Sequence, residues 1–256
     1  MPSRLLAALL LAPLAAPAQD DPLARGRLAM EANDPRGARR WLEQAVRADS
    51  TGYEPNWRLA LVLVDLGKET PDEAKSPARD SLYARAESYA RRAVEANPQG
   101  ADGRFVLANA IGNVALTKSK KERVERAVEI RTEALRALAL DPRHDGALHV
   151  IGRWHAEIMR LGGVQKFFAR KFLGADIFDE ASWDEAERNL RLAVEYRPDF
   201  IYHRLDLAEV LADRKKWQDA KGQLDALLAL PPTHSLDRIH LRRAREVADR
   251  VARELR

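Results

Sequence analysis

Cysteine is absent from the 256 residues, which excludes disulfide bonds, thiol catalysis and cysteine-ligated zinc sites. Long hydrophobic runs are also missing, since the one apolar run is short, so the chain is not a multi-span membrane protein. The excess of positive charge is small: 43 Lys+Arg against 39 Asp+Glu give a net charge of +4, too mild to indicate nucleic-acid binding. Hydrophobic residues make up 46% of the chain, which excludes a disordered chain and allows a sizeable core.

The N-terminal residues 1–18 have the three parts of a secretory signal peptide. Arg4 supplies a positive start, Leu5 to Ala16 is apolar, and Ala16-Pro17-Ala18 has the small-x-small pattern of a cleavage site. The apolar stretch is too short for a permanent membrane anchor, and the lack of cysteine excludes a lipoprotein. We therefore expect an exported protein, periplasmic or secreted after cleavage near Ala18. The alternative is a disordered or buried N-terminal helix.

The rest of the chain has the apolar spacing of helices and contains an internal repeat. The clearest repeat joins residues 34 positions apart: Ala186, Leu190, Ala193 and Pro198 match Ala220, Leu224, Leu227 and Pro232. A small residue, two larger apolar residues and a proline at this period are typical of tetratricopeptide repeats (TPRs). Pro98 and Pro142 end further repeats in the same frame and, with Pro198, are expected to lie just after helix ends.

The predicted fold class is all-α: a TPR-like α-solenoid, a right-handed superhelix of about five helical hairpins and a C-terminal capping helix. The signal peptide is expected at 1–18 and the solenoid domain at 19–256. Two insertions are expected, near 68–78 and 162–181, the second with a short apolar helix. Ser182 and Glu185 have the spacing of a capping box that starts the next helix.

Several local strings resemble the regulator of microtubule dynamics family. They are Trp57-Arg58-Leu59-Ala60, His149-x-x-Gly152-Arg153-Trp154, the run 181–186 and Arg197-Pro198-Asp199, in this order. The resemblance covers roughly residues 50–250. It implies a helical-repeat protein with exported bacterial relatives, and the family's name implies tubulin association. It supplies no catalytic residues to transfer.

A polar stripe on one predicted helix is the candidate site. His149, Arg153 and Glu157 are four residues apart and so share a face. The resemblance to TPR arrays implies that this face lines a concave groove, together with equivalent residues of the neighbouring repeats: Phe105, Asn109, Asn113, Leu205, Glu209 and Asp213. Arg153 is suited to bind a carboxylate through a bidentate fork. In the alternative, Arg153 pairs with Glu157 and His149 packs on the inserted helix.

The predicted function is a non-enzymatic protein-binding or scaffold module of the cell envelope. Its groove is expected to take a peptide or protein partner, for which an acidic group or carboxylate would suit Arg153. The alternatives are a microtubule-associated regulator, as the family name implies, and an enzyme using His149 and Glu157. No cofactor or metal is expected, because phosphate-loop, nucleophile-elbow and zinc motifs are missing and the spacing of His144, His149 and His155 does not place them on one face.

Two basic segments raise the question of other partners. The run Lys118 to Arg123 is interleaved with acidic residues, which indicates a solvated face, and no nucleic-acid partner is expected. The Phe-rich segment 164–173 is basic and amphipathic, so membrane-surface contact is an alternative to docking on the solenoid. Trp154 is expected to be a core residue, or to pack under the second insertion, rather than to contact a ligand.

Overall fold

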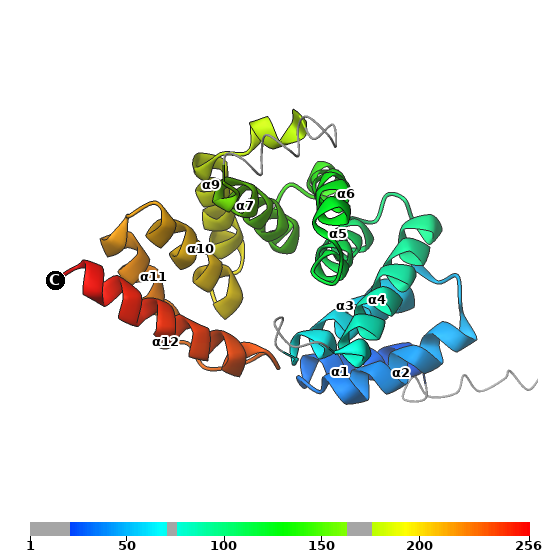
Figure 1. The fold of residues 1–256 in the computed structure, drawn as a ribbon. Helices are drawn as coiled ribbons and strands as arrows, with labels where there is room; N and C mark the ends of the chain where they lie inside the picture. The colour runs from blue at the N-terminus through cyan, green and yellow to red at the C-terminus, as the bar shows by residue number, and fades with distance from the viewer. Residues whose placement is uncertain (1–20, 71–75, 163–175) are drawn as a thin grey trace, which may run out of the picture.

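A computed structural model describes residues 21–70, 76–162 and 176–256, and this part of the chain is helical without strands (Figure 1). The helices are α1 (Pro22–Glu31), α2 (Pro35–Ala48), α3 (Tyr53–Lys68), α4 (Pro77–Ala96), α5 (Ala101–Ala115), α6 (Lys120–Leu140), α7 (Asp145–Arg160), the 3-10 helix η2 (Asp176–Glu180), α9 (Trp183–Tyr196), α10 (Ile201–Asp213), α11 (Trp217–Leu228) and α12 (Asp237–Glu254). The predicted all-α fold class is confirmed. None of the described helices has the length and apolar character needed to cross a membrane.

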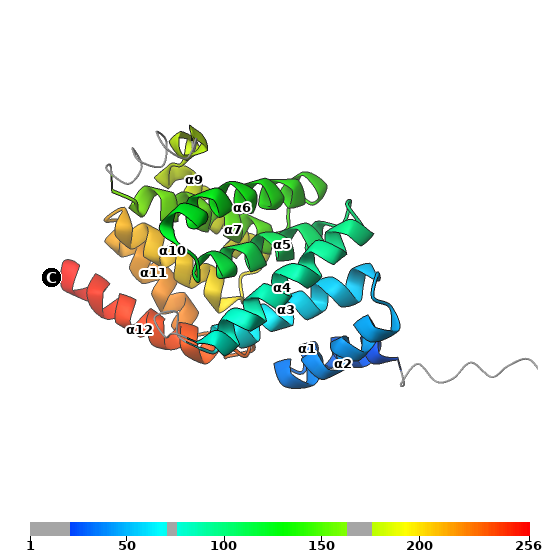
Figure 2. The ribbon, with the colours of Figure 1, turned by 45° about the vertical axis from the view of Figure 1, so that its right-hand side comes forward.

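The helices pack as five successive pairs, α1/α2, α3/α4, α5/α6, α7/α9 and α10/α11, and α12 packs on the last pair. Five hairpins and a capping helix are therefore confirmed. The pairs follow one another along an arc, which Figure 2 shows from a second direction. The predicted signal peptide lies outside the described residues, as do 71–75 of the first predicted insertion and 163–175 of the second, including its apolar helix. The domain division stays a prediction.

The helix ends follow from the residues at the repeat boundaries. Asn97, Asp141 and Arg197 end α4, α6 and α9 in non-helical conformations, with φ between −137° and −142°. Each precedes a proline, whose ring disfavours the helical conformation in the residue before it. Ser182 starts α9, because its hydroxyl accepts a hydrogen bond from the Glu185 backbone N–H at 3.1 Å. The repeat prolines therefore set the hairpin boundaries as predicted.

Small residues allow the two helices of a pair to approach closely. Ala186 and Ala220 are fully buried. At Gly152 of α7, an added Cβ would lie 2.6 Å from Leu190 Cγ and 3.1 Å from the Ala186 carbonyl oxygen of α9. The α7/α9 crossing therefore has no room for a larger residue at position 152.

Trp154 is a core residue, as predicted. It is 4% exposed, and its indole N–H donates to the Ala127 carbonyl at 2.8 Å. Its ring lies 6.0 Å from that of Phe178 in η2, edge to face. This tryptophan therefore joins α6, α7 and η2.

The first helices of neighbouring pairs also pack on one another: α3 on α5, α5 on α7, and α7 on α10. We call the side of the arc formed by these four helices the inner side. The second hairpin and the last hairpin meet there, because the Lys68 ammonium lies 5.4 Å from the centre of the Tyr202 ring. His234, before α12, lies 3.5 Å from Asp65 of α3. The arc is thus closed across these contacts.

Candidate functional site

The predicted stripe of α7 meets polar residues of α10. His149 Nε2 lies 3.0 Å from Asp206 Oδ2, and Arg153 Nε lies 3.4 Å from the same oxygen. Arg153 also donates to the Tyr202 hydroxyl and lies 3.5 Å from Glu157. The predicted pair of Arg153 with Glu157 therefore exists, but Arg153 also reaches buried groups on α10. Asp206 and His149 are 5% and 6% exposed, so most of this cluster is closed to a ligand.

Two histidines link this cluster to a second carboxylate. His203 of α10 lies between Asp145, 2.8 Å from its Nε2, and His149, whose Nδ1 is 2.9 Å from that of His203. Two ring nitrogens form a hydrogen bond only when one of them carries a proton. One of the two inner nitrogens therefore carries a proton, and the chain of contacts from Asp145 through His203 to His149 joins α7 to α10.

Burial sets the protonation of these groups. It lowers the pKa of His149 to about 4 despite the opposing effect of Asp206, so the ring is neutral near pH 7. Burial alone would raise the pKa of Asp206, but Arg153 and His149 outweigh it and hold this pKa well below its usual range. Burial would also raise the pKa of Asp145, but the hydrogen bond with His203 outweighs this effect and lowers the pKa to about 2. Both carboxylates are therefore ionised.

Tyr202 occupies the centre of the inner side. Its ring stacks on that of His240 of α12, with centroids 4.3 Å apart and planes 7° from parallel. It also lies 4.6 Å from the His149 ring. Burial raises the pKa of Tyr202 and lowers that of His240 to about 3, so both are neutral near pH 7. With Lys68, this ring joins α3, α7, α10 and α12.

The predicted residues of α10 are neutralised by arginines or buried. Glu209 accepts two hydrogen bonds from Arg243 of α12, at 2.5 and 2.9 Å. Asp213 accepts from Arg160 of α7 at 2.6 and 2.8 Å. Leu205 is fully buried in the core, so the expectation that it lines the groove is wrong. A shift of one residue along α10 explains this, since Asp206 faces the inner side in its place.

The residues of α5 are only partly held by their neighbours. Asn113 is buried and donates to the Asn109 backbone oxygen at 2.8 Å and to its side-chain oxygen at 3.1 Å. Phe105 packs on His144, with ring centroids 4.8 Å apart. Within the described residues, the amide nitrogen of Asn109 donates no hydrogen bond, and this half-buried side chain keeps a donor for a ligand. Asn109 is therefore the predicted residue best suited to bind a peptide backbone.

Sequence reasoning missed Tyr202, His203 and Asp206. The alternative interpretation packed His149 on the inserted helix, which lies outside the described residues; among the described residues, His149 packs on Tyr202 and His203. One signal was available: Asp206 stands between Leu205 and Leu207, and a charged residue within an apolar helical run is rarely buried without a partner.

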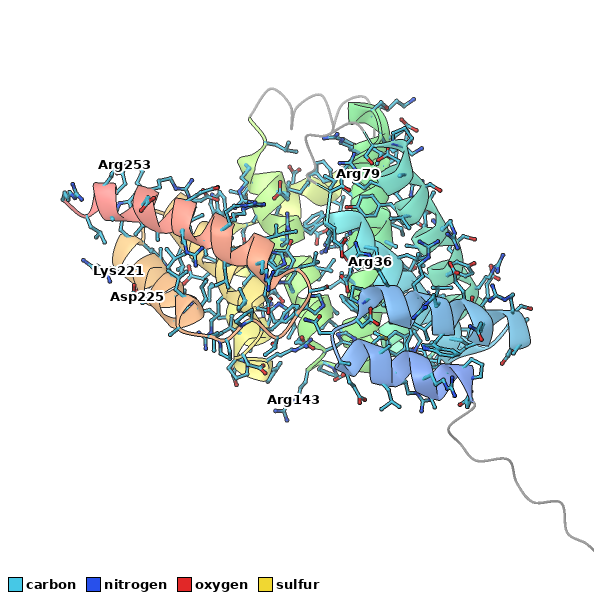
Figure 3. The ribbon with its side chains drawn as sticks, turned by 90° about the horizontal axis from the view of Figure 1, so that it is seen from below. Arg36, Arg79, Arg143, Lys221, Asp225 and Arg253 are labelled. Carbon is cyan, nitrogen blue, oxygen red and sulfur yellow. The ribbon has the colours of Figure 1, made fainter. Side chains whose placement is uncertain are left out.

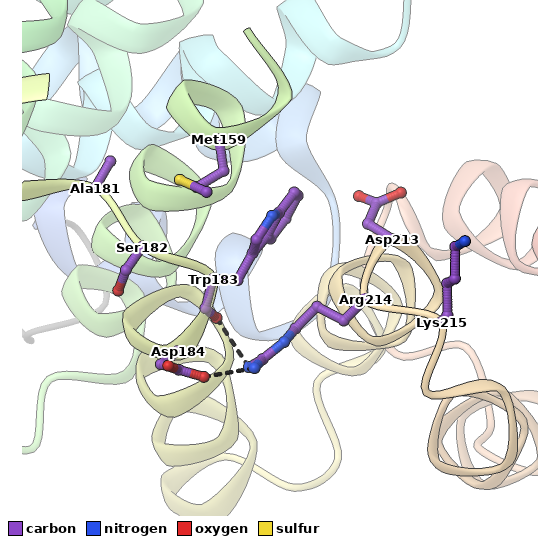
Figure 4. A pocket seen from close by; sticks show the side chains of 8 residues that line it. All are labelled: Met159, Ala181, Ser182, Trp183, Asp184, Asp213, Arg214 and Lys215. Atoms are coloured by element: carbon purple, nitrogen blue, oxygen red, sulfur yellow. Dashed lines mark hydrogen bonds and ion pairs between the residues drawn. The ribbon is translucent and has the colours of Figure 1, made fainter. Parts of the chain in front are cut away.

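A surface pocket of about 540 Å³ lies where the C-terminal ends of α7 and α10 meet the start of α9 (Figure 4). Its lining residues are Met159, Ala181, Ser182, Trp183, Asp184, Asp213, Arg214 and Lys215. Arg214 donates to the Trp183 carbonyl at 3.2 Å and to Asp184 at 2.5 Å, so its charge is used to join α10 to α9. Among the described residues, no three histidine, aspartate or glutamate side chains are grouped as metal ligands would be.

The paired helices, the repeat frame and the closed arc define a TPR-like α-solenoid. The chain belongs to the family described as regulator of microtubule dynamics protein 1-3, whose family model matches residues 25–252. A comparison with curated protein sequences gives no match.

Solved structures of TPR and related proteins resemble the chain. TTC0263, a thermophilic TPR protein of Thermus thermophilus, has a TM-score of 0.62 and 19% identity, over 93% of this chain and 99% of that one. MamA has a TM-score of 0.41 and 15% identity, over 89% of this chain and 96% of that one. YrrB, a TPR protein with an unusual peptide-binding site, has a TM-score of 0.41 and 15% identity, over 86% of this chain and 90% of that one. The likeness to TTC0263 shows the fold.

Proposed function

We propose that this chain is a non-enzymatic protein-binding module that takes a peptide segment of its partner on the inner side of the arc. The observation that carries the proposal is the polar character of that side. Asn109, Arg153 and Glu157 stand on successive first helices at partly or fully exposed positions, above a buried polar cluster. Buried polar groups cost free energy, so their presence on this side supports a functional role.

The chemistry of these groups defines the partner. The free amide donor of Asn109 is suited to bind a peptide carbonyl. The Arg153 side chain is 35% exposed, and its exposed part is suited to bind a carboxylate of the peptide. An enzyme using His149 and Glu157 is disfavoured, because His149 is buried against Asp206 and Glu157 is paired with Arg153 and Arg160.

Capture experiments test the proposal. The chain is cross-linked in an extract of the cell envelope, and the captured proteins are compared for wild type, Asn109→Ala and the control Gln44→Ala. Gln44 is exposed on α2, away from the inner side. We expect one partner to be lost with Asn109→Ala and kept with Gln44→Ala. Equal capture by all three proteins would contradict the proposal.

We further propose that the chain acts in the cell envelope after export. The support is the signal-peptide pattern of residues 1–18. N-terminal sequencing of the protein from a bacterial host is expected to begin near Gln19. A product that keeps Met1 in the cytoplasm would refute export and would favour the second candidate, a microtubule-associated regulator, which is supported by the family name.

A further inference from the structure

The outer face of α12 carries a row of arginines without partners among the described residues. Arg238, Arg242, Arg245 and Arg253 follow one another at spacings of four, three and eight residues, so they lie along one side of the helix. All four are exposed, and the row extends over about 22 Å at the helical rise. We call these four residues the basic stripe. Figure 3, which labels Arg253, shows α12 at the edge of the molecule.

Exposure alone does not explain the lack of partners. Arg36 of α2 is 73% exposed and still pairs with Glu69 at 2.6 Å. Arg243, the exposed residue next to Arg242 on α12, pairs with Glu209. In the described part of the chain, the arginines of the basic stripe make no hydrogen bond, ion pair or ring contact. Arg40 and Arg47 of α2 are also exposed without a described partner, so what distinguishes α12 is the number of such arginines, four along one side of a single helix.

The same chain shows what such arginines bind. Arginines and carboxylates join successive second helices of the solenoid: Arg85 with Glu43 between α4 and α2, Arg126 with Glu87 between α6 and α4, and Arg191 with Asp219 between α9 and α11. Past α12, no further helix of the described chain supplies carboxylates. These pairs join second helices, whereas α12 packs on α10 and α11 as the first helix of a next pair would. The basic stripe therefore offers the same arginine chemistry on a helix face that contacts no described carboxylate.

We propose that the basic stripe is a docking surface for a helix of another protein that presents carboxylates at three- and four-residue spacing. Charge complementarity supports this partner, since guanidinium groups pair with carboxylates in a bidentate geometry. Glu246 and Asp249 interrupt the stripe, and they fit a partner with a patterned charge rather than a uniformly anionic membrane. The large hydrophobic residues that are exposed in the described chain lie outside α12, so this helix presents none for membrane insertion. This surface is separate from the inner side and does not depend on the function proposed there.

The test uses two labelled synthetic peptides of about 20 residues, long enough to be helical. One carries glutamates at alternating three- and four-residue spacing, and the other has the same composition in scrambled order. Vesicles of phosphatidylglycerol and phosphatidylcholine form a third arm. Binding of each probe to the full chain is measured by fluorescence anisotropy or co-sedimentation at low and high salt, because contacts between exposed charges weaken with salt.

Two charge-reversal variants distinguish an effect of the basic stripe from an effect of the net charge of the chain. Arg238→Glu/Arg242→Glu changes the stripe, and Arg40→Glu/Arg47→Glu makes the same change in net charge on the exposed side of α2, where these arginines also lack a partner among the described residues. We expect the patterned peptide to bind more tightly than the scrambled one, and the stripe variant to lose about tenfold or more in affinity while the α2 variant keeps it.

Three results would overturn the proposal. The first is no preference for the patterned peptide over the scrambled peptide. The second is an equal loss in both charge-reversal variants, which would show an effect of net charge. The third is stripe-dependent binding of the vesicles without binding of the patterned peptide, which would assign the surface to a membrane.

Discussion

The ammonium nitrogen of Lys68 and the ring of Tyr202, 134 residues apart in sequence, meet at 5.4 Å across the inner side of the arc. A solenoid is otherwise held together by contacts between neighbouring repeats. This contact, with His234 beside Asp65, joins the second hairpin directly to the last hairpin and the capping helix. The arc therefore behaves as a closed unit, and Tyr202 is expected to contribute to the stability of four helices at once.

Replacement of Tyr202 tests this role. Tyr202→Ala removes the stacking on His240 and the contact with Lys68, and we expect a loss of about 3 kcal/mol in the free energy of unfolding. Tyr202→Phe keeps the ring and removes only the hydroxyl that accepts from Arg153, with an expected loss of about 1 kcal/mol. Urea unfolding measures both. Equal losses would show that the ring contacts do not stabilise the arc.

Arg153 is expected to be needed for stability as well as for binding. Arg153→Ala leaves the buried carboxylate of Asp206 with His149 as its remaining partner within the cluster, at an expected cost of about 3 kcal/mol. Asp206→Asn removes the charge that Arg153 offsets. In the double variant Arg153→Ala/Asp206→Asn, the loss is therefore expected to be smaller than the sum of the single losses. Additive losses in urea unfolding would show that the two side chains are not coupled.

The buried histidines predict a loss of stability in acid. The pKa of His149 is about 4 in the folded chain against an ordinary value of 6.5, so the unfolded chain takes up a proton first. Stability from this group is complete above pH 6.5 and falls by about 1.4 kcal/mol per pH unit toward pH 4. His240, with a pKa of about 3, acts in the same direction.

Urea unfolding between pH 7 and pH 4 checks this expectation. His149→Gln removes the titrating group. We expect the free energy of unfolding of this variant to depend less on pH than that of the wild type, whatever the effect of the substitution at pH 7. Below pH 4, the lowered pKa of Asp145 adds a further loss, because the unfolded chain again binds its proton first. A stability that stays constant from pH 7 to pH 4 in the wild type would contradict the neutral, buried state of His149.

A pair of glycine substitutions tests the helix crossing. Gly152→Ala places a methyl group 2.6 Å from Leu190 Cγ and 3.1 Å from a backbone oxygen, and we expect it to cost about 1–3 kcal/mol. Gly222 of α11 is the control, because its Cβ would meet nothing within 4 Å. Gly222→Ala is expected to stabilise the helix by about 1 kcal/mol. Thermal melts that rise for both variants would mean that the α7/α9 crossing is looser than the structure shows.

The sequence predicted the fold well because the repeat marks are local. Pro98, Pro142 and Pro198 act on the residue directly before them, and each does end a helix. Ala186 and Gly152 are small where two helices of one hairpin cross, and this spacing is set by the repeat itself. Such signals need no knowledge of distant contacts.

The site was predicted less well because it depends on the relation between repeats. The frame placed His149, Arg153 and Glu157 on the inner side, but the side chain that faces them from α10 is Asp206 rather than Leu205. The rotation of α10 about its axis relative to α7 decides which of its side chains faces α7. A repeat period does not specify this rotation. The contact of Lys68 with Tyr202 depends on the curvature of the whole arc.

Site-specific photo-cross-linking tests most directly whether the partner binds on the inner side. A photoreactive amino acid is placed at Asn109 on α5 and, in a separate protein, at Leu135, an exposed residue of the second helix α6. Both proteins are irradiated in cells that make the chain at its natural level. We expect a cross-linked partner from position 109 and none from position 135. A partner cross-linked from position 135 and not from position 109 would contradict it.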